Sequence, residues 1–172
     1  MTASGSEDAA DLVEVKLVGL PVAIAARAQE HADELLREFT LIAAGPSRGG
    51  EHALPRQLTD LVEELTTQYG GLTAAQEAAL GEAVAQGLIE VDLVYQLPRT
   101  VSAAVAHLGD LLDQADEYCR QGEHLLTLAT PPESLAYRRW YLGEFTRQIA
   151  GEPPHSWQQW FETHPGVLGE ST

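Results

Sequence analysis

The chain repeats its own pattern, and this repeat constrains the fold more than any other feature of the sequence. Residues 13–18 (VEVKLV) return as residues 89–94 (IEVDLV) at a spacing of 76, and each copy is soon followed by Leu-Pro. The same spacing aligns His31 with His107, and both halves read His-x3-Leu-Leu. Two copies of an amphipathic strand–helix unit can bury their apolar faces on each other. We therefore expect an internally duplicated, pseudo-symmetric fold.

Local patterns divide the chain into elements. Period-two alternation predicts strands at 13–17 and 89–97. Helical periodicity predicts helices at 21–44, 55–69, 101–121 and 132–150, and a capping-box pattern at Thr73 predicts another at 73–86, separated from its predecessor by Gly70-Gly71. Residues 125–129 fit either a short strand or a helical extension.

These elements predict one α+β domain over residues 12–151, mainly helical, with duplicated strand–helix units and a small two- to three-stranded sheet. Residues 1–11 read as a disordered acidic tail, and residues 152–172 as a Pro-rich and aromatic C-terminal segment.

Charge and composition exclude several functions. The formal net charge is −16, with 26 acidic and 10 basic residues, which argues against nucleic acid or an anionic membrane as partner. The chain shows no apolar run of membrane-spanning length and no basic-then-apolar leader, so we expect a cytoplasmic protein. Any charged partner surface should be basic.

The repeated histidines raise the question of a metal site. His31 with Glu34, and His107 with Asp110, each place an imidazole and a carboxylate three residues apart on a helix. At about 100° per residue, however, both histidines fall at the edges of their apolar stripes and Asp110 lies nearly opposite its own. The pattern therefore favours histidines that anchor helix ends or strands over a transition-metal site, and no cofactor is predicted.

Other reactive side chains also have structural interpretations. Cys119 lies on an apolar stripe next to Asp116 and Glu117, which would raise the pKa of a thiol, so we expect a buried structural cysteine rather than a nucleophile. Arg138 and Arg139 could hold a partner's carboxylate or a phosphate, although internal ion pairs are the commoner use. The sequence shows no phosphate loop and no Ser-His-Asp pattern.

The C-terminal segment carries an aromatic cluster. Trp157, Trp160 and Phe161 are three and four residues apart, which places them on one side of a short helix. They either fold back to complete the core or anchor another protein.

Several whole segments carry a resemblance to a known group of proteins. They are the Leu-Pro steps at 20–21 and 97–98 and the segments at 29–31, 34–39, 115–119, 125–133 and 137–145. Together, over residues 13–150, they resemble a family of small, uncharacterised actinobacterial proteins associated with partner-switching signalling, in which STAS-domain antagonists pair with ATPases related to histidine kinases. The chain lacks the Asp-x-Gly-x-Gly nucleotide box of those ATPases and a clear Ser or Thr loop of the STAS type. The resemblance thus implies a third component of such a system.

We therefore expect a non-enzymatic regulatory or adaptor protein that binds other proteins, with a STAS-domain or ATPase regulator as partner and a homodimer as a further possibility. The candidate contact residues are Arg138, Arg139, Trp157, Trp160 and Phe161. The alternative is a small metal- or ligand-binding protein, conceivably an enzyme, that uses His31 and His107.

Overall fold

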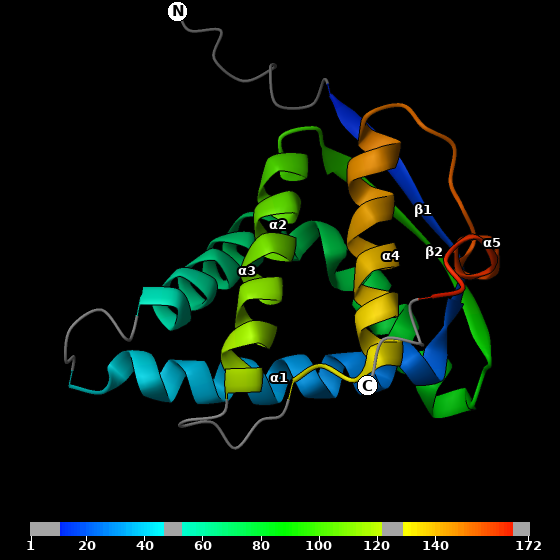
Figure 1. Ribbon diagram of the computed structural model, residues 1–172. Coiled ribbons are helices and arrows are strands. Elements are labelled where there is room, and N and C mark those ends of the chain that lie inside the picture. The colour runs from blue at the N-terminus through cyan, green and yellow to red at the C-terminus, as the bar shows by residue number, and fades with distance from the viewer. Residues whose placement is uncertain (1–10, 47–52, 122–128, 167–172) are drawn as a thin grey trace, which may run out of the picture.

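The computed structural model describes residues 11–46, 53–121 and 129–166. Within these ranges the protein is a mainly helical α+β fold with five helices and one two-stranded antiparallel sheet (Figure 1). The predicted acidic tail, except for Asp11, and residues 125–128 lie outside the described residues. The third strand suggested at residues 125–129 therefore stays a prediction.

The two predicted strands pair with each other. β1 (Leu12–Pro21) runs antiparallel to β2 (Glu90–Pro98), with Lys16 opposite Val94. Alternate residues of both strands are buried on one face, as the period-two pattern predicts: Val15, Leu17, Leu93, Tyr95 and Leu97. The register shifts between Leu17 and Leu20, where Gly19 adopts a φ of 63° and donates its N–H to Asp92 Oδ1 at 2.7 Å.

Glutamine side chains from two helices cover the outer edges of this sheet. On the β1 side, Gln148 accepts the Lys16 N–H at 2.9 Å and donates to the Lys16 carbonyl at 2.8 Å. On the β2 side, Gln76 donates to the Val94 carbonyl at 2.5 Å. Because every strand of a two-stranded sheet is an edge, these amides stand in for missing neighbouring strands.

Four long helices pack around the sheet. They are α1 (Val22–Ala44), α2 (Ala53–Gln86), α3 (Val101–Gln121) and α4 (Pro132–Ile149), and the short α5 (Trp157–Thr163) follows. In Figure 1, α3 and α4 stand side by side across α1, and α2 arches behind them. The order strand–helix–helix occurs in both halves, but α2 has 34 residues and α4 has 18. The duplication itself therefore stays a prediction.

The predicted break in the second helical segment is wrong. Gly70 and Gly71 lie inside the continuous helix α2, and neither has a positive φ. The Thr73 hydroxyl bonds to the Gly70 carbonyl and to Glu77 instead of capping a new helix. Two glycines weaken a helix without ending it when tertiary contacts continue on both sides, and here Leu65, Tyr69, Ala79 and Leu80 all pack against the core.

The core has two parts. The larger cluster lies between the sheet, α4 and the first turns of α1 and α3, and contains the fully buried Trp140. The second cluster lies between α1, α2 and α3, away from the sheet, and is built around Phe39, Leu58 and Leu111. The apolar stripes predicted for these helices are the faces that make both clusters.

Candidate functional site

The two adjacent arginines of α4 have different roles. The side chain of Arg138 is 14% exposed, and its Nη2 donates to Asp113 Oδ1 at 2.7 Å and to Asp116 Oδ2 at 2.5 Å. The Asp116 side chain is only 3% exposed. Arg138 therefore joins α4 to α3 and is not free to hold a partner.

This ion pair extends to Thr130 and His31. Asp116 accepts both the Thr130 backbone N–H and its hydroxyl, and that hydroxyl also shares a hydrogen bond with His31 Nε2 at 3.2 Å. Burial raises the pKa of Asp116, but the charge of Arg138 and the Thr130 hydrogen bonds outweigh it and hold the pKa below its ordinary 3.8. The network ties α1, α3 and α4 together, with His31 contributing from the middle of α1.

The structure does not assemble the four suggested metal ligands. Glu34, His107 and Asp110 are exposed, whereas His31 is partly buried against Thr130. Across the three described ranges, no three His, Cys, Asp or Glu side chains are grouped so that they could hold a metal ion. The metal hypothesis gains no geometric support.

Arg139 faces a groove between α3 and α4. The groove has a volume of about 280 Å³ and is lined by Val105, Ala106, Gly109, Asp110, Asp113, Arg138, Arg139, Leu142, Gly143 and Thr146. Its small residues leave it open: a Cβ added at Gly143 would meet nothing within 4 Å. Arg139 is exposed on the rim, and no ion pair joins it to another part of the described chain. Sequence reasoning found Arg139 but missed the groove, which exists only where two helices meet.

The aromatic tail folds back onto the domain. Trp157 and Trp160 are partly buried and pack against the larger core cluster, and Trp157 lies edge-on to Trp140 with 5.7 Å between ring centroids. Trp160 in turn stacks on Trp157 and on His164, with ring centroids 5.8 Å and 4.4 Å apart, respectively. Phe161 touches the Trp157 ring at 5.5 Å and also remains partly exposed. Of the two interpretations of this segment, the contacts support completion of the core.

A polar network that sequence reasoning did not identify holds this tail in place. The Glu144 side chain is 1% exposed and accepts hydrogen bonds from Arg147, Gln148 and the His155 N–H. Arg147 also bonds to Glu152 and to the Pro153 carbonyl, and the Trp140 indole donates to the His155 carbonyl at 3.0 Å. A buried carboxylate is stable here because it is both paired and hydrogen-bonded.

Cys119 is a buried thiol, as predicted. It is 8% exposed and packs in the second core cluster. Burial, with the nearby charges of Asp116 and Glu38, raises its pKa to about 11. Such a thiol is almost fully protonated near neutral pH, which is the opposite of a nucleophilic cysteine.

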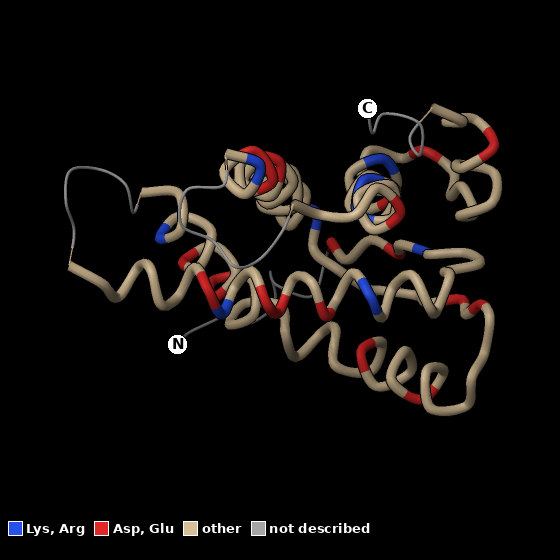
Figure 2. The backbone as a smooth tube through the Cα atoms, turned by 60° about the horizontal axis from the view of Figure 1, so that its bottom comes forward, with Lys and Arg blue, Asp and Glu red and all other residues tan. Residues whose placement is uncertain are grey.

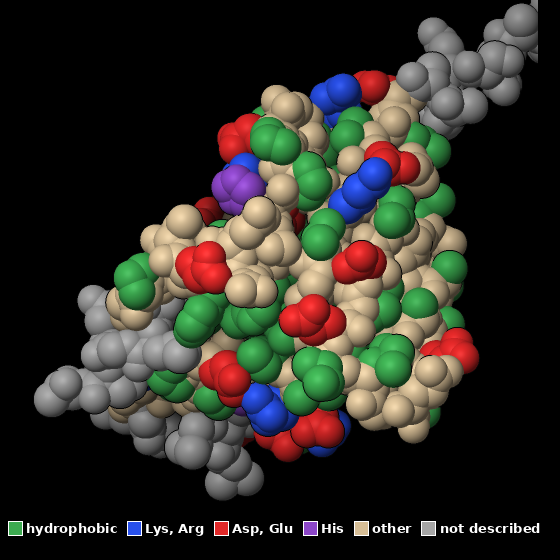
Figure 3. Space-filling model, turned by 90° about the vertical axis from the view of Figure 1, so that its right-hand side faces the viewer, with side chains coloured by type: hydrophobic (Ala, Val, Ile, Leu, Met, Phe, Trp, Pro, Cys, Tyr) green, Lys and Arg blue, Asp and Glu red, His purple; other side chains and the backbone are tan. Residues whose placement is uncertain are grey.

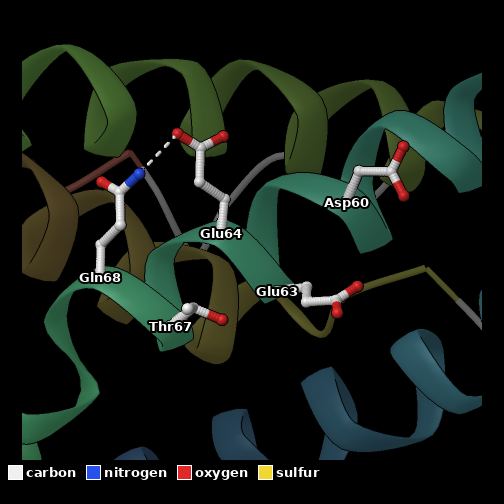
Figure 4. Close-up of a pocket in the computed structure, with 5 residues that line it drawn as sticks. All are labelled: Asp60, Glu63, Glu64, Thr67 and Gln68. Atoms are coloured by element: carbon white, nitrogen blue, oxygen red, sulfur yellow. Dashed lines mark hydrogen bonds between the residues drawn. The ribbon is translucent and has the colours of Figure 1, made fainter.

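A second hollow lies on the surface of α2. It is lined by Asp60, Glu63, Glu64, Thr67 and Gln68, all from this one helix (Figure 4). The Glu64 side chain accepts a hydrogen bond from Gln68 at 3.0 Å, and the three carboxylates do not converge on a common point. Among the described residues, no second helix or strand lines this hollow, so we assign no site to it.

Comparisons identify no relatives that could guide the assignment of a site. The sequence matches no protein family, no curated protein and no solved structure. Among the described helices, none combines the length and the apolar character that crossing a membrane requires.

Proposed function

We propose that this protein is a non-enzymatic regulatory or adaptor protein that binds another protein in the groove between α3 and α4. The observation that carries the proposal is Arg139, an exposed guanidinium on the rim of an open groove in a strongly acidic molecule.

Arg139 differs from most other basic residues of the chain in its ion pairing. Of the chain's ten basic residues, six described ones form ion pairs with its own carboxylates: Lys16, Arg27, Arg99, Arg120, Arg138 and Arg147. Arg139 forms none with the described residues although Asp110 and Asp113 line the same groove. An exposed arginine beside apolar Val105 and Leu142 is typical of a protein-binding surface, where a guanidinium can fork onto a partner's carboxylate.

The groove also has room for part of a partner protein. Gly109, Gly143 and Ala106 lower its floor, and a side chain from a partner could enter there. The resemblance noted above makes STAS-domain proteins and kinase-like ATPases of partner-switching systems the first candidates to test.

The test is affinity capture from cells of the protein's own organism, using the tagged full chain, with quantitative mass spectrometry. We expect one stoichiometric partner whose recovery falls at least about tenfold in Arg139→Glu, since this removes a favourable contact and adds a repulsive charge. Gly143→Gln should have a similar effect because its side chain would occupy the groove.

Arg37→Glu is the matched control. Arg37 is exposed on α1 and has no ion pair with the described residues, so this variant changes the net charge by the same amount at a different place. Equal recovery from Arg139→Glu, Arg37→Glu and the unchanged protein would refute the groove. The absence of any stoichiometric partner would refute the adaptor function.

A further inference from the structure

We infer that the corner where α2 turns into β2 is a second docking surface, and that it takes a basic, amphipathic segment of a partner protein. The inference rests on the proposed function, that the protein acts by binding proteins, but concerns a different surface. The corner comprises Val84, Leu88, Ile89 and Glu90.

Three aliphatic side chains within six residues of the chain are exposed there. Ile89 is 85% exposed, and Val84 and Leu88 are 45% exposed each. The fold needs only the backbone of Ile89, whose carbonyl accepts the Val22 N–H at 3.0 Å. The side chain of Ile89 therefore has no role in the core, and several exposed aliphatic side chains close together in the chain suit an interaction site.

The corner is also rigid. Gly87 ends α2 with a φ of 67°, its N–H bonds to the Val84 carbonyl, and the Leu88 N–H bonds to the Ala83 carbonyl at 3.0 Å. This pair of bonds is a Schellman motif, which fixes the direction in which the chain leaves the helix. The exposed side chains are thus held in place before any partner arrives, which lowers the entropic cost of binding.

The chain on either side of the corner carries charge of one sign. Residues 74–98 contain no Lys, Arg or His, but four acidic residues: Glu77, Glu82, Glu90 and Asp92. In Figure 2, the C-terminal part of α2 and the start of β2 carry acidic residues (red) and no Lys or Arg (blue). Figure 3 shows the face that lies on the right in Figure 1. Hydrophobic (green) and acidic (red) side chains mix across the middle of this face, and Lys and Arg (blue) lie above and below them.

This charge pattern indicates which kind of partner binds the corner. A second copy of the chain would bring another acidic corner against this one, and like charges across an interface are unfavourable. A partner with Lys or Arg on either side of a few large apolar residues would match both the aliphatic centre and the acidic surroundings. Such basic amphipathic helices are a common ligand of grooves and patches on acidic proteins.

The test uses the full chain and a fluorescently labelled helical peptide of leucine and lysine as the probe, with a leucine–glutamate peptide as its charge control. We expect saturable binding of the lysine peptide only. Ile89→Ser should weaken it about tenfold through the loss of one buried aliphatic contact. Leu41→Ser is the matched control, because Leu41 is 72% exposed on α1 and lies far from the corner in the chain. Both variants should keep the thermal stability of the parent protein.

A pair of charge variants separates the corner from net charge alone. Glu82→Gln with Glu90→Gln should weaken binding and reduce its salt dependence more than Asp60→Asn with Glu63→Gln, although both remove two negative charges. Equal effects of the two pairs, unchanged binding by Ile89→Ser, or no saturable binding would overturn the inference. Dimerisation of the unchanged protein that Ile89→Ser abolishes would also overturn it, in favour of a second copy.

The two proposals fail separately. Partner capture that depends on Arg139 with no effect of Ile89→Ser on peptide binding would leave the groove function standing and refute only the corner. Peptide binding that Ile89→Ser weakens, together with a cellular partner whose recovery is the same in Arg139→Glu and the unchanged protein, would leave the corner standing and refute only the groove.

Discussion

The continuity of α2 through Gly70 and Gly71 predicts the sign of a stability change. Replacing a left-handed glycine at a helix end with alanine destabilises a protein, whereas replacing a glycine inside a helix with alanine stabilises it. Gly71 lies inside α2, and a Cβ added there would meet no atom within 4 Å. We therefore expect Gly71→Ala to stabilise the protein.

The size of the effect follows from the same geometry. With no steric cost, the full helix-propensity difference of about 0.8–1.0 kcal/mol should appear in the free energy of unfolding. For a protein of this length, that corresponds to an increase in Tm of about 2–4 °C. Gly81→Ala should behave alike, because its Cβ also points into open space within α2.

Gly87→Ala, at the residue directly after the end of the same helix, is the control with the opposite expected sign. Gly87 has a φ of 67°, so alanine there should cost about 1–2 kcal/mol. Guanidinium unfolding followed by far-UV circular dichroism would measure all three variants. Destabilisation by Gly71→Ala would refute the continuous helix and restore a helix end at Gly70-Gly71.

Three further predictions concern the buried polar groups. The folded pKa of Asp116 lies below its ordinary 3.8, so its carboxylate stabilises the protein above about pH 4, and this stability is lost as the pH falls through the folded pKa. Asp116→Asn should therefore lower Tm near neutral pH and make Tm depend less on pH in acid. Acid unfolding that is unchanged in this variant would contradict the prediction. Cys119, with a pKa of about 11, should react with a thiol reagent at about pH 8 far more slowly in the folded protein than in denaturant, and equal rates would show that it is accessible. Gln148→Leu should lower the free energy of unfolding, measured in urea, by about 1–3 kcal/mol, because the Lys16 N–H and carbonyl lose their partners at the sheet edge. An unchanged free energy of unfolding would mean that water replaces the amide.

The sequence by itself determined the elements whose signals are local. Alternating apolar residues predicted both strands, and periodic apolar stripes predicted α1, α3 and α4 with the faces that form the core. The buried state of Cys119 followed from the same stripes. These predictions succeed because the pattern of a segment records which of its own faces must leave water.

Only the tertiary structure decided the features that depend on distant residues. Gly70-Gly71 has the composition of a helix end, but packing on both sides of it carries α2 through. Arg138 and Arg139 are neighbours in the chain, yet the position of α3 pairs one with Asp113 and Asp116 and leaves the other on a groove. Trp157 and Trp160 complete the core because Glu144 and Arg147 turn the chain back onto α4. In each case the outcome depends on which surfaces meet in space, and the free energy of that contact outweighs the local preference.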